Sequence, residues 1–163
     1  MSLFLLAAHL LTSPALAGEK LLFNDSFTGA GAVGVEAGFV IDECWASVYQ
    51  PDAADYPFSL EHVDMLIGGS SSGSTFTVNF WSLPGTDMST ATLMGGEGVI
   101  LTGSETEMNR VLVSDLELGL PDITEGNIAV SVCFEEHSGA PSIAYDSDGA
   151  DLSLTYVYGD IGL

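Results

Sequence analysis

The chain has 163 residues, of which 47% are hydrophobic, and it carries 23 acidic side chains but only two basic ones, for a formal net charge of −21 at pH 7. The hydrophobic fraction argues against a disordered chain, and the length suits one domain with a single core. The charge disfavours nucleic acid and anionic lipid as partners, because both would be repelled. The negative charge favours solubility and cation binding. A solvated acidic surface with no further role is an equally simple explanation of the charge.

Residues 1–17 have the pattern of a secretory signal peptide. An apolar stretch at residues 3–11 leads to Ala15, Leu16 and Ala17, the small-x-small pattern of a cleavage site. The stretch is shorter than the roughly 20 residues that cross a bilayer. No Lys or Arg precedes it, so a buried N-terminal strand stays an alternative. We expect residues 18–163 to form one exported domain, secreted or held in the cell envelope, with no membrane insertion after the signal is removed.

The rest of the chain contains short runs typical of β-strands, and helical periodicity is hard to find. In chain order these runs are residues 20–27, 38–49, 61–69, 74–82, 97–102, 109–118, 127–136 and 152–158. The clearest is 74–82, in which Phe76, Val78 and Phe80 share one face. The glycine-rich segments 68–74 and 94–98 are predicted as flexible turns. About eight short strands with this period predict an all-β fold, an antiparallel β-sandwich of jelly-roll type.

Cys44 and Cys133 are the only cysteines. An even count in an exported chain predicts a disulfide between them. Cys133 shares its strand face with Ala129 and Ser131, opposite the larger apolar residues of the same run. We therefore expect the bond to join neighbouring strands, on the less buried face of the sheet or at a strand end. A zinc site is disfavoured because there is no C-x-x-C spacing, although His137 follows Cys133 by four residues.

The segment SIAYDSDGADLSLTYVY places three carboxylates, those of Asp146, Asp148 and Asp151, around Gly149. The Asp-Gly pair between alternating runs predicts a β-hairpin, in which Asp146 faces Asp151. Two carboxylates opposed across a strand pair repel one another, and a bound cation would reverse the sign of that interaction. The EF-hand template does not fit this spacing. A calcium site at these three aspartates and a plain solvated turn both remain open.

Trp81 lies on the polar face of its predicted strand, where it could stack against a sugar ring. The alternative is that a second sheet or a loop covers it. Trp45 is expected to pack against the disulfide. His62 is expected to be a surface residue. Residues 29–34 match a dinucleotide-binding pattern and residues 69–73 match a nucleophile elbow, but strands rather than helices follow both, so neither match is functional.

The stretches GFVIDECW, HVDMLIGG, FTVNFWS and PSIAYDSDG together resemble a small exported β-sandwich domain of bacterial secreted proteins. In that family the late P-x-I-A-x-D segment precedes the last strand. The resemblance implies a jelly-roll-like fold and an extracellular or envelope location, and it carries no catalytic residue.

These observations predict a secreted, non-catalytic module for binding or envelope structure, whose loops divalent cations bridge. The alternative is a carbohydrate-active domain, either a lectin-like binder that uses Trp81 or a small glycosidase. No spacing singles out a carboxylate pair, so the enzyme is the weaker form of that alternative. A glycan or a cell-surface component is the expected partner. A third class is a protein that docks by adding a strand to an exposed sheet edge.

Overall fold

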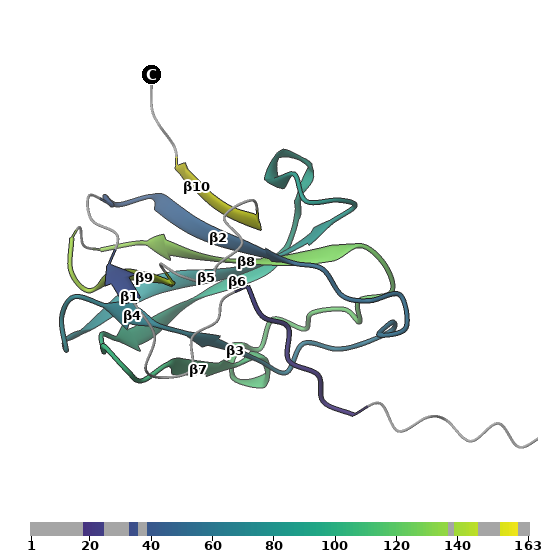
Figure 1. Ribbon diagram of the computed structural model, residues 1–163, viewed down its shortest axis with the longest axis horizontal. Helices are drawn as coiled ribbons and strands as arrows, with labels where there is room; N and C mark the ends of the chain where they lie inside the picture. The colour runs from purple at the N-terminus through teal and green to yellow at the C-terminus, as the bar shows by residue number, and fades with distance from the viewer. Residues whose placement is uncertain (1–17, 25–32, 36–38, 137–138, 147–153, 160–163) are drawn as a thin grey trace, which may run out of the picture.

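The structure is a computed structural model that describes residues 18–24, 33–35, 39–136, 139–146 and 154–159 (Figure 1). Within these residues ten strands and two short 3-10 helices follow one another. They are β1 (Val33–Val35), β2 (Glu43–Tyr49), β3 (His62–Met65), β4 (Ile67–Gly68), β5 (Gly73–Leu83), η1 (Met88–Thr90), β6 (Thr92–Thr102), β7 (Asn109–Leu112), η2 (Val113–Leu116), β8 (Asn127–Phe134), β9 (Ser142–Asp146) and β10 (Thr155–Gly159).

The predicted all-β, antiparallel fold is confirmed, with ten strands in the described residues in place of about eight. The single strand expected at 61–69 is divided at Leu66 into β3 and β4, and the short β1 and β9 add to the count. Among the described residues, no helix is long and apolar enough to cross a membrane.

The strands form two layers. One is a five-stranded sheet in the order β10-β2-β8-β5-β6, and facing it are a three-stranded sheet, β1-β9-β4, and a two-stranded sheet, β3-β7 (Figure 1). Three of the pairings are nested along the chain, those of β2 with β10, β4 with β9 and β5 with β8, whereas β1 with β9 and β3 with β7 are not. This wrapping of early strands against late ones is that of a jelly roll.

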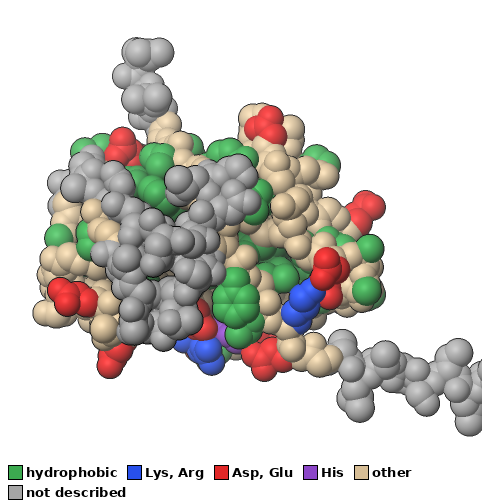
Figure 2. Space-filling model, viewed as in Figure 1, with side chains coloured by type: hydrophobic (Ala, Val, Ile, Leu, Met, Phe, Trp, Pro, Cys, Tyr) green, Lys and Arg blue, Asp and Glu red, His purple; other side chains and the backbone are tan. Residues whose placement is uncertain are grey.

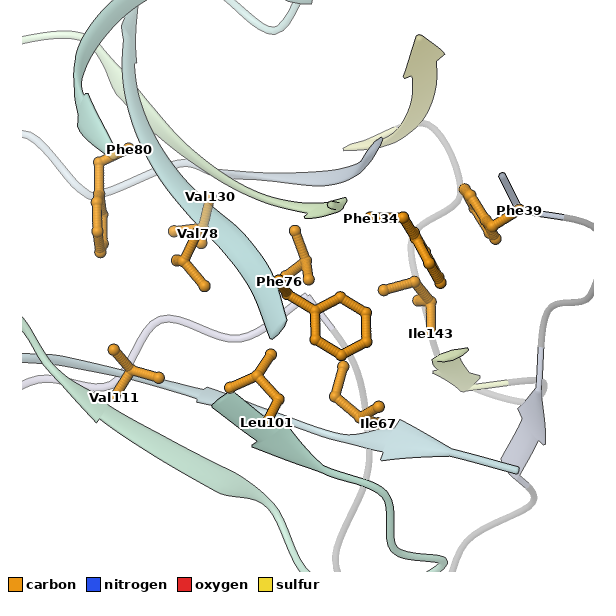
Figure 3. Close-up of a cluster of buried hydrophobic side chains, with 11 residues drawn as sticks. Phe39, Ile67, Phe76, Val78, Phe80, Leu101, Val111, Val130, Phe134 and Ile143 are labelled. Atoms are coloured by element: carbon orange, nitrogen blue, oxygen red, sulfur yellow. The ribbon is translucent and has the colours of Figure 1, made fainter. Parts of the chain in front are cut away.

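The main core fills the space between the layers. Phe76, Val78 and Phe80 of β5 are fully buried on the inner face, as their alternation predicts. Figure 3 shows them among buried side chains of the facing strands, including Ile67 of β4 and Ile143 of β9.

The outer face of the large sheet is buried as well, which was not expected. Its central residues are small, and Ala46, Ala129 and Ser131 have no exposed surface. The rings of Trp81 on β5 and Tyr158 on β10 meet edge to face above them, with their centroids 6.2 Å apart. We call Trp81, Tyr158 and Ser131 the aromatic cover. The rings of Trp81 and Tyr158 therefore shield these small residues from solvent. From the alternation of apolar and polar residues in one strand alone, they would be expected to be exposed.

The predicted disulfide joins Cys44 of β2 to Cys133 of β8, which lie directly opposite one another with their Cα atoms 4.0 Å apart. The expectation that it links neighbouring strands is confirmed. Of the two expected positions, the strand end is confirmed, because Cys44 is the second residue of β2 and Cys133 is the last but one of β8. The face is not a less buried one, because the aromatic cover lies on it and both cysteines are buried. Trp45 does not pack against the bond, since adjacent strand residues point to opposite faces. It lies instead against Phe39, with ring centroids 6.1 Å apart.

Residues 94–98 are not a turn but part of the edge strand β6. A side chain at Gly96 would place its Cβ 1.9 Å from Oδ1 of Asn79 on the paired strand β5. Glycine is needed there because another side chain comes so close, and not because the backbone turns.

The turn of the hairpin predicted around Asp148 and Gly149, and its partner residue Asp151, lie outside the described residues, and the described strands on either side do not pair with one another. Strand β9 lies between β1 and β4, and its residue Asp146 is paired with Val33. Strand β10 belongs to the other layer, where it pairs with β2. Within β9, β4 pairs with Ser142 and Ile143, and β1 pairs with residues 144–146.

Candidate functional site

A groove with a volume of about 680 Å³ opens at one side of the sandwich. Its floor comes from β2 and β8 of the large sheet, one wall comes from β3 of the small sheet, and the N-terminal segment 18–23 forms another side. The apolar lining includes Tyr49, Leu60, Val63, Met108, Ile128 and Val130. In Figure 2, apolar, basic, acidic and histidine side chains gather at the lower edge of the visible face.

Both basic residues of the chain lie beside this groove. Lys20 Nζ contacts Asp52 Oδ2 at 2.9 Å and Asp55 Oδ2 at 2.6 Å, which ties segment 18–23 to the acidic loop after β2. The hydrogen bond from Lys20 lowers the pKa of the Asp55 carboxyl, and the pKa of Lys20 is raised in turn. The chain has only two basic residues against 23 acidic ones, and Lys20 is one of the two, so its position at the groove sets this region apart from the rest of the surface.

The second cation, Arg110 of β7, forms a bidentate pair with Asp64 of β3. Its Nε lies 2.8 Å from Oδ1 and its second guanidinium nitrogen, Nη2, lies 2.7 Å from Oδ2. The guanidinium holds the pKa of Asp64 below its usual range. The two residues are also directly opposite in the β3–β7 register, so the backbone pairing presets the geometry of the ion pair.

His62 lies on the same face of β3 as Asp64, since the two residues are two apart along the strand. Its side chain is only 10% exposed. Its Nε2 atom is buried, has no hydrogen-bond partner among the described residues, and lies 3.7 Å from Oδ2 of Asp64. That distance is too long for a hydrogen bond. The prediction of a surface histidine is therefore wrong.

Two carboxylates approach the same imidazole. Glu19 arrives on segment 18–23 and Glu61 directly precedes β3, and each places a carboxylate oxygen within 4.8 Å of a ring nitrogen of His62 and of the other carboxylate. Both glutamates are exposed. The arrangement offers one nitrogen and two oxygens to a single point at the rim of the groove.

The sites predicted from sequence lie elsewhere. Asp148 and Asp151 fall outside the described residues, and of Asp146 only the strand position is described. Trp81 is half-buried in the aromatic cover, where its Nε1 donates to Ser131 Oγ at 3.0 Å. Sequence reasoning did not find the groove, because Glu19 and Glu61 are 42 residues apart and no motif links them. The sequence feature that could have indicated the groove is the scarcity of basic residues, since Lys20 and Arg110 both lie beside it.

Comparison with protein-family models, with curated proteins and with solved structures finds no match for this chain. Function is therefore inferred from the groove itself. Its apolar floor can hold an apolar group, and its acidic rim can hold a metal ion or a cationic group.

Proposed function

We propose that the protein is an exported, non-catalytic binding module, and that the groove beside segment 18–23 holds its ligand. The observation that carries the proposal is the juxtaposition of an apolar floor, formed by residues such as Ile128 and Val130, with charged groups that converge at one rim. Ligand sites in proteins are typically concave and mostly apolar, with a few placed polar groups that fix orientation.

The charge of the rim indicates the class of ligand. Glu19, Asp55, Glu61 and Asp64 all line the groove, whereas Lys20 is its one basic lining residue. A ligand with an apolar body and a cationic group satisfies both parts of the groove. The net charge of the chain also raises the local concentration of cations before they bind.

A pair of dyes tests this proposal. A fluorescent dye with an alkyl chain and a trimethylammonium head should bind, and a dye with the same chain and a sulfonate head should bind at least tenfold more weakly. Met108→Asn should weaken binding of the cationic dye about fivefold or more, because Met108 lines the groove and is 39% exposed. Ile100→Asn is the matched control, since Ile100 is 76% exposed on the edge strand β6, outside the groove lining.

Two outcomes would overturn the proposal. One is equal binding of both dyes, which would mean that the acidic rim does not select the ligand. The other is an unchanged affinity in Met108→Asn, which would place the dye elsewhere on the protein.

Carbohydrate binding through Trp81 is the second candidate, and the clustering of Trp81 with Tyr158 on the outer sheet face favours it. Aromatic rings on a sheet surface suit sugar rings. Glycan-array binding that Trp81→Phe preserves and Trp81→Ala abolishes would support this function. If the array shows no binding, or if binding survives Trp81→Ala, the ring serves packing alone.

Calcium binding by Asp146, Asp148 and Asp151 remains the proposal for the acidic segment after β9. Calcium at about a hundred times its dissociation constant should stabilise the fold by roughly 2.7 kcal/mol. Thermal unfolding with calcium and with chelator measures this, and Asp148→Asn should remove the difference. Identical melting curves in calcium and chelator would contradict the site.

A further inference from the structure

We infer that Glu19, Glu61 and His62 form a binding site for a divalent transition metal of the zinc class, at the rim of the groove. The three side chains come from two segments that are distant in sequence, and their ligand atoms lie within 4.8 Å of one another. The inference does not require the groove to hold an organic ligand, because the metal binds to the protein's own side chains.

The buried imidazole is the observation that separates this cluster from an ordinary acidic patch. Acidic residues are abundant on this chain, and most gatherings of them need no ion. A histidine whose side chain is nine-tenths buried, and whose Nε2 atom makes no hydrogen bond within the described part of the chain, is different. Leaving a buried polar atom without a partner costs on the order of 1–3 kcal/mol, so such an atom in a native protein calls for an explanation. A ligand at this imidazole supplies one.

The donor set selects the class of metal. Calcium prefers six to eight oxygen ligands, whereas an imidazole nitrogen with carboxylate oxygens suits zinc and related first-row metals. Tetrahedral zinc with bonds of about 2.0–2.1 Å requires ligand atoms roughly 3.3 Å apart. Glu19 and Glu61 are exposed at the rim, so rotation of their side chains can close the remaining distance. Three protein ligands leave a fourth position open toward the groove.

The neighbouring ion pair supports the metal site from outside it. Asp64 lies 3.7 Å from Nε2 of His62, and Arg110 holds both of its carboxylate oxygens. In metal sites a ligating histidine commonly donates the N–H of its other ring nitrogen to a carboxylate. Asp64 lies near Nε2 and beyond hydrogen-bond distance, so it adds negative charge beside the site and does not orient the ring. The charges of Glu19, Glu61 and Asp64 exceed that of Arg110 by two, which a divalent cation balances.

Zinc titration of the purified exported protein by calorimetry tests the inference, with cobalt as a spectroscopic substitute for zinc. One equivalent of zinc should bind. His62→Gln and Glu61→Gln should each weaken binding at least tenfold, and the visible absorption of bound cobalt should disappear in His62→Gln. Glu97→Gln is the control, because it removes one exposed carboxylate from β6 and leaves the three ligands in place.

Because Glu19 is exposed, Glu19→Gln is expected to fold normally, and it keeps the test decisive if His62→Gln does not fold. Weak zinc binding at several sites, reduced equally by Glu97→Gln and Glu61→Gln, would overturn the inference. A tight site that survives all three ligand substitutions would overturn it too. Met108→Asn should leave zinc affinity unchanged, so failure of the dye experiment and failure of the metal experiment are separate results.

Discussion

The aromatic cover and the rim of the groove each bury a polar side chain, and they treat it in opposite ways. Ser131 has no exposed surface, and its Oγ accepts hydrogen bonds from Trp81 at 3.0 Å and from Tyr158 at 2.8 Å. His62 is nearly as buried, but its Nε2 has no hydrogen-bond partner in the described part of the chain. The first region is complete as folded, whereas in the second the Nε2 atom makes no hydrogen bond to a described residue and has only the Asp64 carboxylate near it, at 3.7 Å.

The difference shows how a polar cluster that stabilises the fold can be separated from one that binds a ligand. Trp81, Tyr158 and Ser131 satisfy one another's hydrogen bonds, so the cover stabilises the fold as it stands. At the rim, ion pairs fix Lys20 and Arg110 but leave the imidazole unused. The following predictions test this contrast, from the largest expected effect to the smallest.

Removing the disulfide should have the largest effect on the region of the aromatic cover. The bond closes a loop with a sequence separation of 89, and on the chain-entropy model its loss costs about 4 kcal/mol. The double variant Cys44→Ala/Cys133→Ala should lose that much free energy of unfolding in guanidinium, while the folded variant keeps its zinc affinity. A loss below about 1 kcal/mol would mean that the disulfide contributes little to stability. A lost metal site in folded protein would show that the two regions are not independent.

Ser131→Ala should cost about 1–3 kcal/mol, because it leaves the buried donors of Trp81 and Tyr158 without their acceptor. Ser114→Ala is the control, since Ser114 is exposed in η2 and its loss should change stability by less than about 0.5 kcal/mol. Equal effects of the two substitutions in chemical denaturation would mean that the hydrogen bonds of the cover carry little stability.

Features that depend on neighbouring residues in the chain could be predicted from the sequence. Features that depend on contacts between distant residues could not. The alternation of Phe76, Val78 and Phe80 predicted the inner core because period two is a property of a single strand. The disulfide followed from the cysteine count. By contrast, Gly96 lies in a strand because β6 pairs with β5, where it is opposite Asn79, and no local pattern records that contact.

The same reasoning explains the missed hairpin and the missed site. The Asp-Gly signal predicts a turn, but β1 and β4 decide where β9 pairs. The histidine site combines Glu19 with Glu61 and His62 across the fold, so its members look like unrelated polar residues in the sequence. Burial of the imidazole was the decisive observation, and only coordinates contain it.

Arg110→Gln tests the ion pair beside the rim through its pH dependence. The pKa of Asp64 is lowered in the folded protein, so the pair stabilises the fold above the ordinary Asp pKa of about 3.9, and this contribution disappears as pH falls through the lowered value. Arg110 is more than half exposed, so solvent screening keeps the effect small. Unfolding curves of both proteins should differ at pH 7 and converge as the pH falls through the lowered pKa of Asp64. A constant difference across that range would contradict the assignment.

His62→Leu should have the smallest effect on stability and the largest consequence for the comparison. Leucine fills a similar buried volume and removes the unpaired Nε2, so the free energy of unfolding without metal should stay within about 1 kcal/mol or rise. Zinc at a hundred times the dissociation constant of the unsubstituted protein stabilises that protein by about 2.7 kcal/mol, and this gain should vanish in the variant. A large loss of stability without metal would mean that His62 is a satisfied structural residue like Ser131. The rim would then resemble the aromatic cover, and the contrast between the two regions would no longer indicate a ligand.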